Sequence, residues 1–249
     1  MMAVPQWLPA GTVYGTLLNF RREHALWAPR MSEAPYKAAP KAPVLYVKTA
    51  NTFAICGAAV AVPGEVEMGA TIGLVIGESE QKRHSAQAGH TPKAMNNGAF
   101  GGMNIAGCVL LNDLSLPHTS YYRPAIRYRN RDGFLVCGPA AEALPLTAVG
   151  ALRLEVRVNG ELRQTVELST LVRDAATLLT DVSDFMGLQP GDVLMLGTDC
   201  LADGTRPRAG PGDRIEISAP GFAPLGHTLV DDAPAGNSKD ASVRGGGAS

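Results

Sequence analysis

The segment from Leu111 to Phe134 concentrates residue types that can do chemistry: an Asn-Asp pair, paired tyrosines and four arginines. Guanidinium groups bind carboxylates through two parallel hydrogen bonds, so such a cluster is typical of a site for an anionic ligand. For any single arginine, an ordinary surface ion pair is the simpler interpretation. For the cluster as a whole we favour an anion site, formed by Tyr121, Tyr122, Arg123, Arg127, Arg129 and Arg131.

Three further motifs surround this segment in a fixed order. FRREHALW contains His24, GATIGLVIG runs from Gly69 to Gly77, and LMLGTDC runs from Leu194 to Cys200. With these motifs the chain resembles the fumarylacetoacetate hydrolase family over residues 11–232. The resemblance implies a mainly β (α+β) fold, namely the family's mixed β-roll with few helices, and a dimeric assembly.

The resemblance also implies a metal site. Family members hold a divalent cation (Mg²⁺, Mn²⁺ or Ca²⁺) with a Glu-x-Glu on one strand and the Asp of an Asn-Asp pair on a later strand, and the cation stabilises an enolate. Asp113 matches that aspartate, but Gly69 and Thr71 stand at the two glutamate positions and supply no carboxylate. Glu65 and Glu67 form a Glu-x-Glu four residues earlier, which only a bulge or a shifted register would bring to the site.

The remaining roles are carried over residue by residue. His24 matches the general base of the family and Thr198 matches a residue that binds a substrate carboxylate. The plainer interpretations are a surface histidine on a short helical turn and an ordinary turn residue. Tyr122, Arg123 and Arg129 are the other predicted substrate-binding residues. Arg129 replaces a lysine, so it keeps the charge but makes a poor base.

Three functions follow from the resemblance. The first is a subunit of an isomerase/decarboxylase acting on 5-oxopent-3-ene-1,2,5-tricarboxylate and 2-hydroxyhepta-2,4-diene-1,7-dioate in aromatic catabolism. The second is a metal-free, non-catalytic subunit that supports an active paralogue, so the assembly would be a homodimer or a heterodimer. The third is a fumarylacetoacetate or acylpyruvate hydrolase.

Composition excludes several other classes of function. The formal net charge of −1 over 249 residues gives no field that would attract nucleic acid or an anionic membrane. No stretch has the roughly 18 consecutive apolar residues of a membrane-spanning helix, and the N-terminus lacks the pattern of a signal peptide, so we expect a cytoplasmic protein. The cysteines show no metal-like spacing; they are Cys56, Cys108, Cys137 and Cys200. We expect the remaining histidines at the surface, namely His84, His90, His118 and His227.

The elements that must position the site are mostly strands. Short β-prone runs at 12–20, 42–48 and 69–77 are bounded by Gly, Pro or polar residues, and a polar, glycine-rich stretch at 78–104 predicts a long surface loop. Asn159-Gly160 between alternating runs predicts a tight hairpin.

Apolar residues at helical spacing predict an amphipathic helix between 169 and 187, with Ser169 or Thr170 as its N-cap. From these elements we predict three parts of the chain. Residues 1–10 form an extension, residues 11–230 form one fumarylacetoacetate hydrolase-like domain, and residues 231–249 form a disordered tail.

Overall fold

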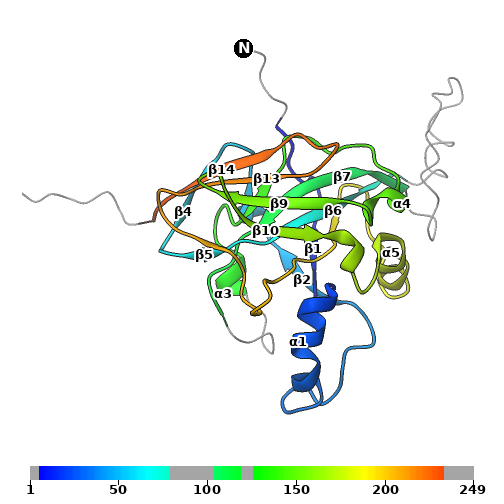
Figure 1. Ribbon diagram of the computed structural model, residues 1–249. Helices are drawn as coiled ribbons and strands as arrows, with labels where there is room; N and C mark the ends of the chain where they lie inside the picture. Colours follow the sequence, from blue (N-terminus) through cyan, green and yellow to red (C-terminus); the bar gives the residue numbers. More distant parts are fainter. Residues whose placement is uncertain (1–5, 79–103, 119–125, 233–249) are drawn as a thin grey trace, which may run out of the picture.

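Two β-sheets face each other across the main hydrophobic core (Figure 1). The computed structural model describes residues 6–78, 104–118 and 126–232. The larger sheet has seven strands, in the order β2 (Val44–Lys48), β1 (Val13–Leu17), β11 (Val193–Met195), β6 (Ala70–Gly77), β7 (Asn104–Asp113), β8 (Leu135–Cys137) and β3 (Phe53–Ala54). The smaller sheet has five, in the order β10 (Glu161–Glu167), β9 (Arg153–Val158), β13 (Arg214–Ser218), β14 (Leu225–Asp231) and β4 (Ala59–Val62).

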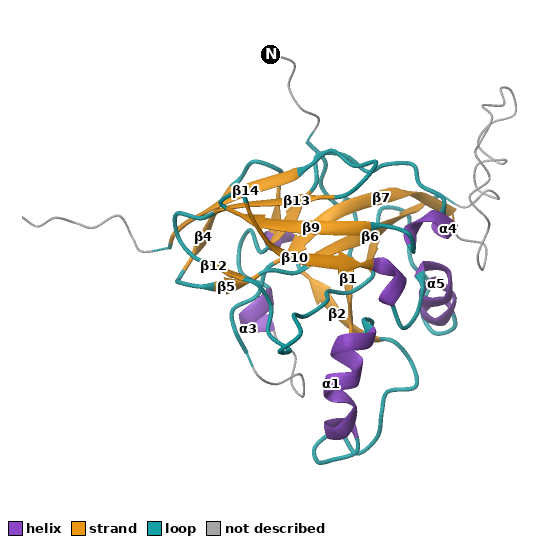
Figure 2. Ribbon diagram, viewed as in Figure 1, coloured by secondary structure: helices purple, strands orange, loops and turns teal. Residues whose placement is uncertain are grey.

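Helices are few and lie outside the sheets (Figure 2). A two-stranded ladder joins β5 (Val66–Glu67) to β12 (Arg208–Ala209). The α-helices of the described residues are α1 (Arg21–Met31), α3 (Ile126–Arg129), α4 (Leu146–Val149) and α5 (Ala175–Ser183), and 3₁₀ turns occur at Ala50–Thr52 and Leu168–Thr170. None of these helices is long and apolar enough to cross a membrane.

Strands β6 and β7 are apolar on both faces because each face meets a core. Alternate residues of β6, among them Ile72 and Leu74, pack toward the five-stranded sheet. The opposite face, with Val75 of β6 and Val109 of β7, joins a second cluster inside the curl of the seven-stranded sheet. Strands buried on both faces read as continuous hydrophobic runs, which is why GATIGLVIG lacks a polar face.

The seven-stranded sheet curls until its outer strand β2 approaches β8. Asn130 donates a hydrogen bond from Nδ2 to the Val47 carbonyl at 3.0 Å, and Lys48 donates from Nζ to the Phe134 carbonyl at 2.9 Å. Parallel and antiparallel pairs both occur in this sheet. The predicted mainly β, mixed-roll fold with few helices is confirmed.

The hairpin between β9 and β10 turns at Asn159 and Gly160, whose φ angles are 53° and 85°. These positive angles are the ones that a two-residue turn requires and that Asn-Gly supplies at low cost. The prediction for this hairpin is confirmed.

Helix α5 starts later than the sequence suggested. Its N-cap is Asp174, which accepts a hydrogen bond from the Thr177 N–H at 2.8 Å. The preceding residues are held extended by Asn19, whose carbonyl accepts from the Val172 N–H and whose Oδ1 accepts from the Arg173 N–H. A long-range tie therefore overrides the local helical pattern, and the prediction of an N-cap at Ser169 or Thr170 was wrong.

Two predictions fall largely outside the described residues: the surface loop at 78–104 and the disordered tail. Strand β14 continues to Asp231, the first residue of the predicted tail.

Candidate functional site

Asp113, at the end of β7, is fully buried and both of its carboxylate oxygens are engaged. Oδ1 lies 2.9 Å from Nζ of Lys48 on β2. Oδ2 accepts a hydrogen bond from Nη1 of Arg129 at 2.8 Å and a second one from the Tyr46 hydroxyl. We call Tyr46, Lys48, Asp113 and Arg129 the Asp113 cluster.

Burial and neighbouring charges shift the pKa values of Asp113, Lys48 and Tyr46. Burial alone would raise the pKa of Asp113, but Lys48 and Arg129 outweigh it and hold that pKa below its ordinary value. Burial lowers the pKa of Lys48, against the pull of Asp113, and raises that of Tyr46 well above the usual value. The Arg129 guanidinium also lies over the Tyr46 ring, 4.8 Å from its centroid.

The residues at the family's metal positions do not fit a divalent cation. Gly69 lies opposite Asp113, whose N–H donates to the Gly69 carbonyl at 2.9 Å. A Cβ added at Gly69 would come within 2.6 Å of Thr198 Cγ2 and 2.7 Å of the Asp113 carbonyl oxygen, so no glutamate side chain has room there. Thr71 is buried, and its hydroxyl faces the carbonyl of Ile72 at 3.4 Å.

The earlier Glu-x-Glu lies elsewhere. Glu67 pairs with Ser115 across the strands, and its carboxylate faces Arg208 at 3.3 Å. Glu65 is exposed and lies 3.9 Å from the same guanidinium. Within the described ranges, no three His, Cys, Asp or Glu side chains come together to hold an ion. We therefore derive no chemical step through a cation on this chain.

Asn112, beside Asp113, ties the two sheets together from the opposite face of β7. Its Oδ1 accepts a hydrogen bond from the Gly69 N–H at 3.1 Å, so its amide nitrogen points to Nε2 of His227 at 2.9 Å. Nε2 must then be the acceptor, and the neutral ring carries its proton on Nδ1. His227 is 2 % exposed, which corrects the expectation of a surface histidine.

This arrangement predicts acid destabilisation. Burial lowers the pKa of His227 to about 4 from an unfolded value near 6.5, so between these values the unfolded chain binds the extra proton and stability falls as pH falls. We expect wild type to lose about 2 kcal/mol from this residue between pH 7 and pH 5, measured by urea unfolding. A His227→Gln variant should lack that part of the slope, and an identical slope in both proteins would contradict the assignment.

A cleft of about 690 Å³ opens between α1 and the segment that follows β11. Glu23, Trp27 and Arg30 of α1 form one wall, and Arg206 and Arg208 lie in the other. The lining holds acidic and basic side chains together with Leu26 and Trp27. Its guanidinium groups suit carboxylates, and Leu26 and Trp27 suit an apolar part of a ligand.

His118 lines the same cleft and is half-buried, again contrary to the expectation of a surface histidine. Its ring stacks on Tyr128 with centroids 5.2 Å apart, and Nδ1 lies 3.0 Å from the Leu116 carbonyl. Burial is the largest cause that lowers its pKa, and the Arg129 and Arg206 charges add to it. Burial and these charges together favour the neutral form of the ring.

The structure brings only some of the predicted site residues together. Arg129 belongs to the Asp113 cluster, and Thr198 is buried against Gly69. His24 is half-buried on α1, but the cleft wall is built from its neighbours. Tyr122 and Arg123 lie outside the described residues.

Sequence reasoning missed Tyr46, Lys48, Glu23 and Arg206. The signal for Lys48 was present, since a lysine that ends the apolar run APVLYVK has to find a partner once that run is buried. The other three gave no local signal.

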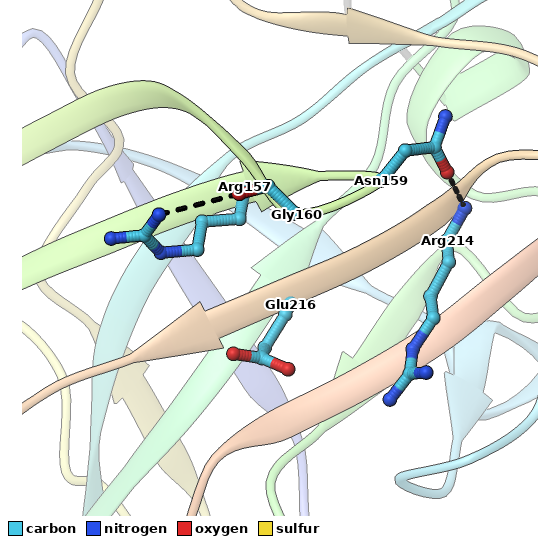
Figure 3. A pocket seen from close by; sticks show the side chains of 5 residues that line it. All are labelled: Arg157, Asn159, Gly160, Arg214 and Glu216. Atoms are coloured by element: carbon cyan, nitrogen blue, oxygen red, sulfur yellow. Dashed lines mark hydrogen bonds between the residues drawn. The ribbon is translucent and has the colours of Figure 1, made fainter.

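A second hollow, of about 230 Å³, lies on the outer face of the five-stranded sheet (Figure 3). Arg157 donates to the Gly160 carbonyl at 3.3 Å, and the Arg214 backbone N–H donates to Asn159 Oδ1 at 2.9 Å. Arg157 also pairs with Glu155, and about a third of each side chain is exposed. This is the solvated face of a sheet, and we assign no function to it.

Comparison with known proteins agrees with this fold. The profile described as "Fumarylacetoacetate (FAA) hydrolase C-terminal" matches residues 12–230. The chain belongs to the fumarylacetoacetate hydrolase family. It is 37% identical over 224 residues to the Escherichia coli 4-hydroxyphenylacetate degradation bifunctional isomerase/decarboxylase, covering 89% of this chain and 48% of that protein. The chain thus spans about half the length of that relative, and likewise of an Escherichia coli homoprotocatechuate catabolism isomerase/decarboxylase, 36% identical.

Solved structures of the fumarylacetoacetate hydrolase family share the fold. A 5-carboxymethyl-2-hydroxymuconate delta-isomerase from Mycobacterium smegmatis superposes with a TM-score of 0.64 at 22% identity, over 91% of this chain and 81% of the other. A maleylpyruvate hydrolase from Sphingobium, solved with manganese(II) and pyruvate, gives 0.61 at 18% identity, over 90% and 71%. A divalent ion therefore occurs in this family, although the Asp113 cluster does not fit one.

Proposed function

We propose that this chain is a subunit of an isomerase/decarboxylase that acts on 5-oxopent-3-ene-1,2,5-tricarboxylate and 2-hydroxyhepta-2,4-diene-1,7-dioate in 4-hydroxyphenylacetate catabolism. The observation that supports it most is the similarity to proteins of that named activity, which extends over 89% of the chain. The cleft adds chemical support, because its guanidinium groups suit a ligand with several carboxylates.

The same reaction class needs positive charge at the developing enolate. In metal-binding members a cation such as Mg²⁺, Mn²⁺ or Ca²⁺ supplies it. In this chain Asp113 is neutralised by Lys48 and Arg129, and Gly69 leaves no room for a carboxylate side chain.

These contacts favour a second candidate, a non-catalytic subunit that pairs with a metal-binding paralogue. In either case the assembly is a homodimer or a heterodimer of family members, and the ligand is a small oxo or enol acid. The two candidates differ in whether the purified chain turns over substrate.

The test is to assay the purified chain on both substrates, alone and mixed with an intact paralogue, while Mn²⁺ binding is followed by calorimetry. Turnover by the chain alone that EDTA leaves unchanged would establish a metal-independent enzyme. Turnover that appears only in the mixture, with Mn²⁺ bound by the paralogue, would establish the supporting subunit. No turnover in either sample would reject the proposed reaction. Mn²⁺ binding at micromolar concentration by the chain alone would show that its residues do hold a divalent cation.

A further inference from the structure

Helix α1 is fastened to the opposite wall of the cleft by a buried ion pair. Glu23 Oε1 lies 3.1 Å from Nη2 of Arg206, and the two side chains are only 5 % and 6 % exposed. Beside it, Arg22 donates from Nη1 to the Cys200 carbonyl at 2.7 Å. Both ties join the first turn of α1 to the segment after β11, so together they hold the cleft in its present shape.

Besides these ties and a longer ion pair between Arg22 and Asp199 at 3.8 Å, α1 buries few of its side chains. Its buried residues are Glu23 and Met31, near its two ends, and its N-cap residue Phe20 makes no side-chain capping bond. The helix extends away from the two sheets (Figures 1 and 2). A helix that buries so little apolar surface depends on its polar ties to stay in place.

Glu23 also holds a strained backbone. Its Oε2 accepts a hydrogen bond from the Leu18 N–H at 3.2 Å, and Leu18 has a φ of 59°, in the left-handed region that a leucine rarely adopts. Such strain persists only while the surrounding contacts enforce it. Release of Glu23 would therefore free both α1 and Leu18.

Of the three arginines in the cleft walls, Arg206 is the most deeply buried. Arg208 is 44% exposed and faces Glu67 at 3.3 Å, while Arg30 lies over the Trp27 ring. A buried guanidinium gains more from a carboxylate than an exposed one does, because water screens it less. In this structure the carboxylate on Arg206 belongs to the protein itself.

We propose that Glu23 is an internal stand-in for a ligand carboxylate: a carboxylate ligand takes its place on Arg206 and releases α1 from the cleft wall. The contact is thus autoinhibitory. This inference rests on the proposed function, which supplies the class of ligand. Arg206 exchanges one carboxylate partner for another, so the ion pair itself changes little in free energy. The free-energy cost of ligand binding is that of releasing α1 from the cleft wall, and relief of the backbone strain at Leu18 offsets part of this cost.

The test is the affinity for 2-oxoglutarate, a simple oxo dicarboxylate, measured by calorimetry on the full chain. Wild type should bind weakly, because only the fraction of molecules with α1 released can bind. Glu23→Gln should bind at least about tenfold more tightly, since it removes the competing charge. Arg206→Gln should abolish binding, alone and combined with Glu23→Gln.

Glu67→Gln is the matched control, because it removes the same charge from the same cleft but from beside Arg208. An equal gain in affinity in Glu67→Gln and Glu23→Gln would mean that removing either negative charge from the cleft has the same effect. That result would overturn the proposal. Unchanged or weaker binding by Glu23→Gln would overturn it as well. The gain can appear whether or not the chain turns over the tricarboxylate, so failure of the proposed function is a separate result.

Hydrogen exchange in wild type gives a second, independent readout that does not depend on how well the variants fold. Saturating 2-oxoglutarate should speed exchange of the amides in residues 21–31 and leave those of β6 and β7 unchanged. Slower exchange in residues 21–31, or exchange that the ligand does not alter, would contradict release of α1.

Discussion

Replacing Asp113 with asparagine should destabilise the protein by about 3–5 kcal/mol, because it leaves the buried cations Lys48 and Arg129 without their counter-charge. Both of these side chains are at most 2 % exposed and lie within 2.9 Å of the carboxylate. The quantity to measure is the free energy of unfolding in urea at pH 7. A loss below about 1 kcal/mol would mean that the three groups are not ionised together.

Arg131→Gln provides the matched control. Arg131 lies 2.6 Å from Asp232, closer than either cation lies to Asp113, but the two side chains are 37% and 40% exposed. Water screens such a pair, so we expect a change of less than about 1 kcal/mol. The comparison tests whether burial, and not distance, sets the energy of an ion pair.

A further variant separates charge from packing. Replacing Lys48 and Arg129 with methionine and Asp113 with leucine removes every charge of the Asp113 cluster while keeping much of its volume. Buried ion pairs are often no more stabilising than well-packed apolar groups, so this triple variant should be more stable than Asp113→Asn. Recovery should be incomplete, because the Tyr46 hydroxyl loses its acceptor and the Phe134 carbonyl loses its donor.

The parts of the fold that could be predicted are those set by neighbours in sequence. The short β-prone runs bounded by Gly, Pro or polar residues placed β1, β2 and β6, and the Asn159-Gly160 turn placed one hairpin. The relation of Gly69 and Thr71 to Asp113 came from the resemblance to the family. The period of two in a strand puts Gly69 and Thr71 on one face but does not place Asp113, which lies on another strand. The observed ladder between β6 and β7 has Thr71 opposite Leu111.

The rest could not be predicted because it depends on contacts between distant segments. Lys48 meets Asp113 only because the seven-stranded sheet curls until β2 reaches β8. Glu23 meets Arg206 across 183 positions of the chain. The start of α5 depends in the same way on Asn19. A local pattern can show that Lys48 needs a partner, but it cannot show that Asp113 is that partner.

Restoring the family's glutamate at position 69 should fail for a steric reason and an electrostatic one. In Gly69→Glu the new Cβ would meet Thr198 Cγ2 at 2.6 Å and the Asp113 carbonyl oxygen at 2.7 Å, and a backbone atom cannot rotate away as a side chain can. The carboxylate would then be buried beside Asp113, whose cations are already engaged. We expect a loss of about 4 kcal/mol or more in unfolding free energy, and no gain in Mn²⁺ affinity.

Gly150→Glu controls for the substitution itself, since a Cβ there meets nothing within 4 Å and the backbone needs no positive φ. It should change stability by about 0.5 kcal/mol or less. If Gly69→Glu instead folded with wild-type stability and bound Mn²⁺, this position would still accept a metal-binding carboxylate, and our interpretation of the space around Gly69 would be wrong. The expected failure would show that the packing around Thr198 and the charges around Asp113 have closed this position to a metal, so that one substitution cannot restore it.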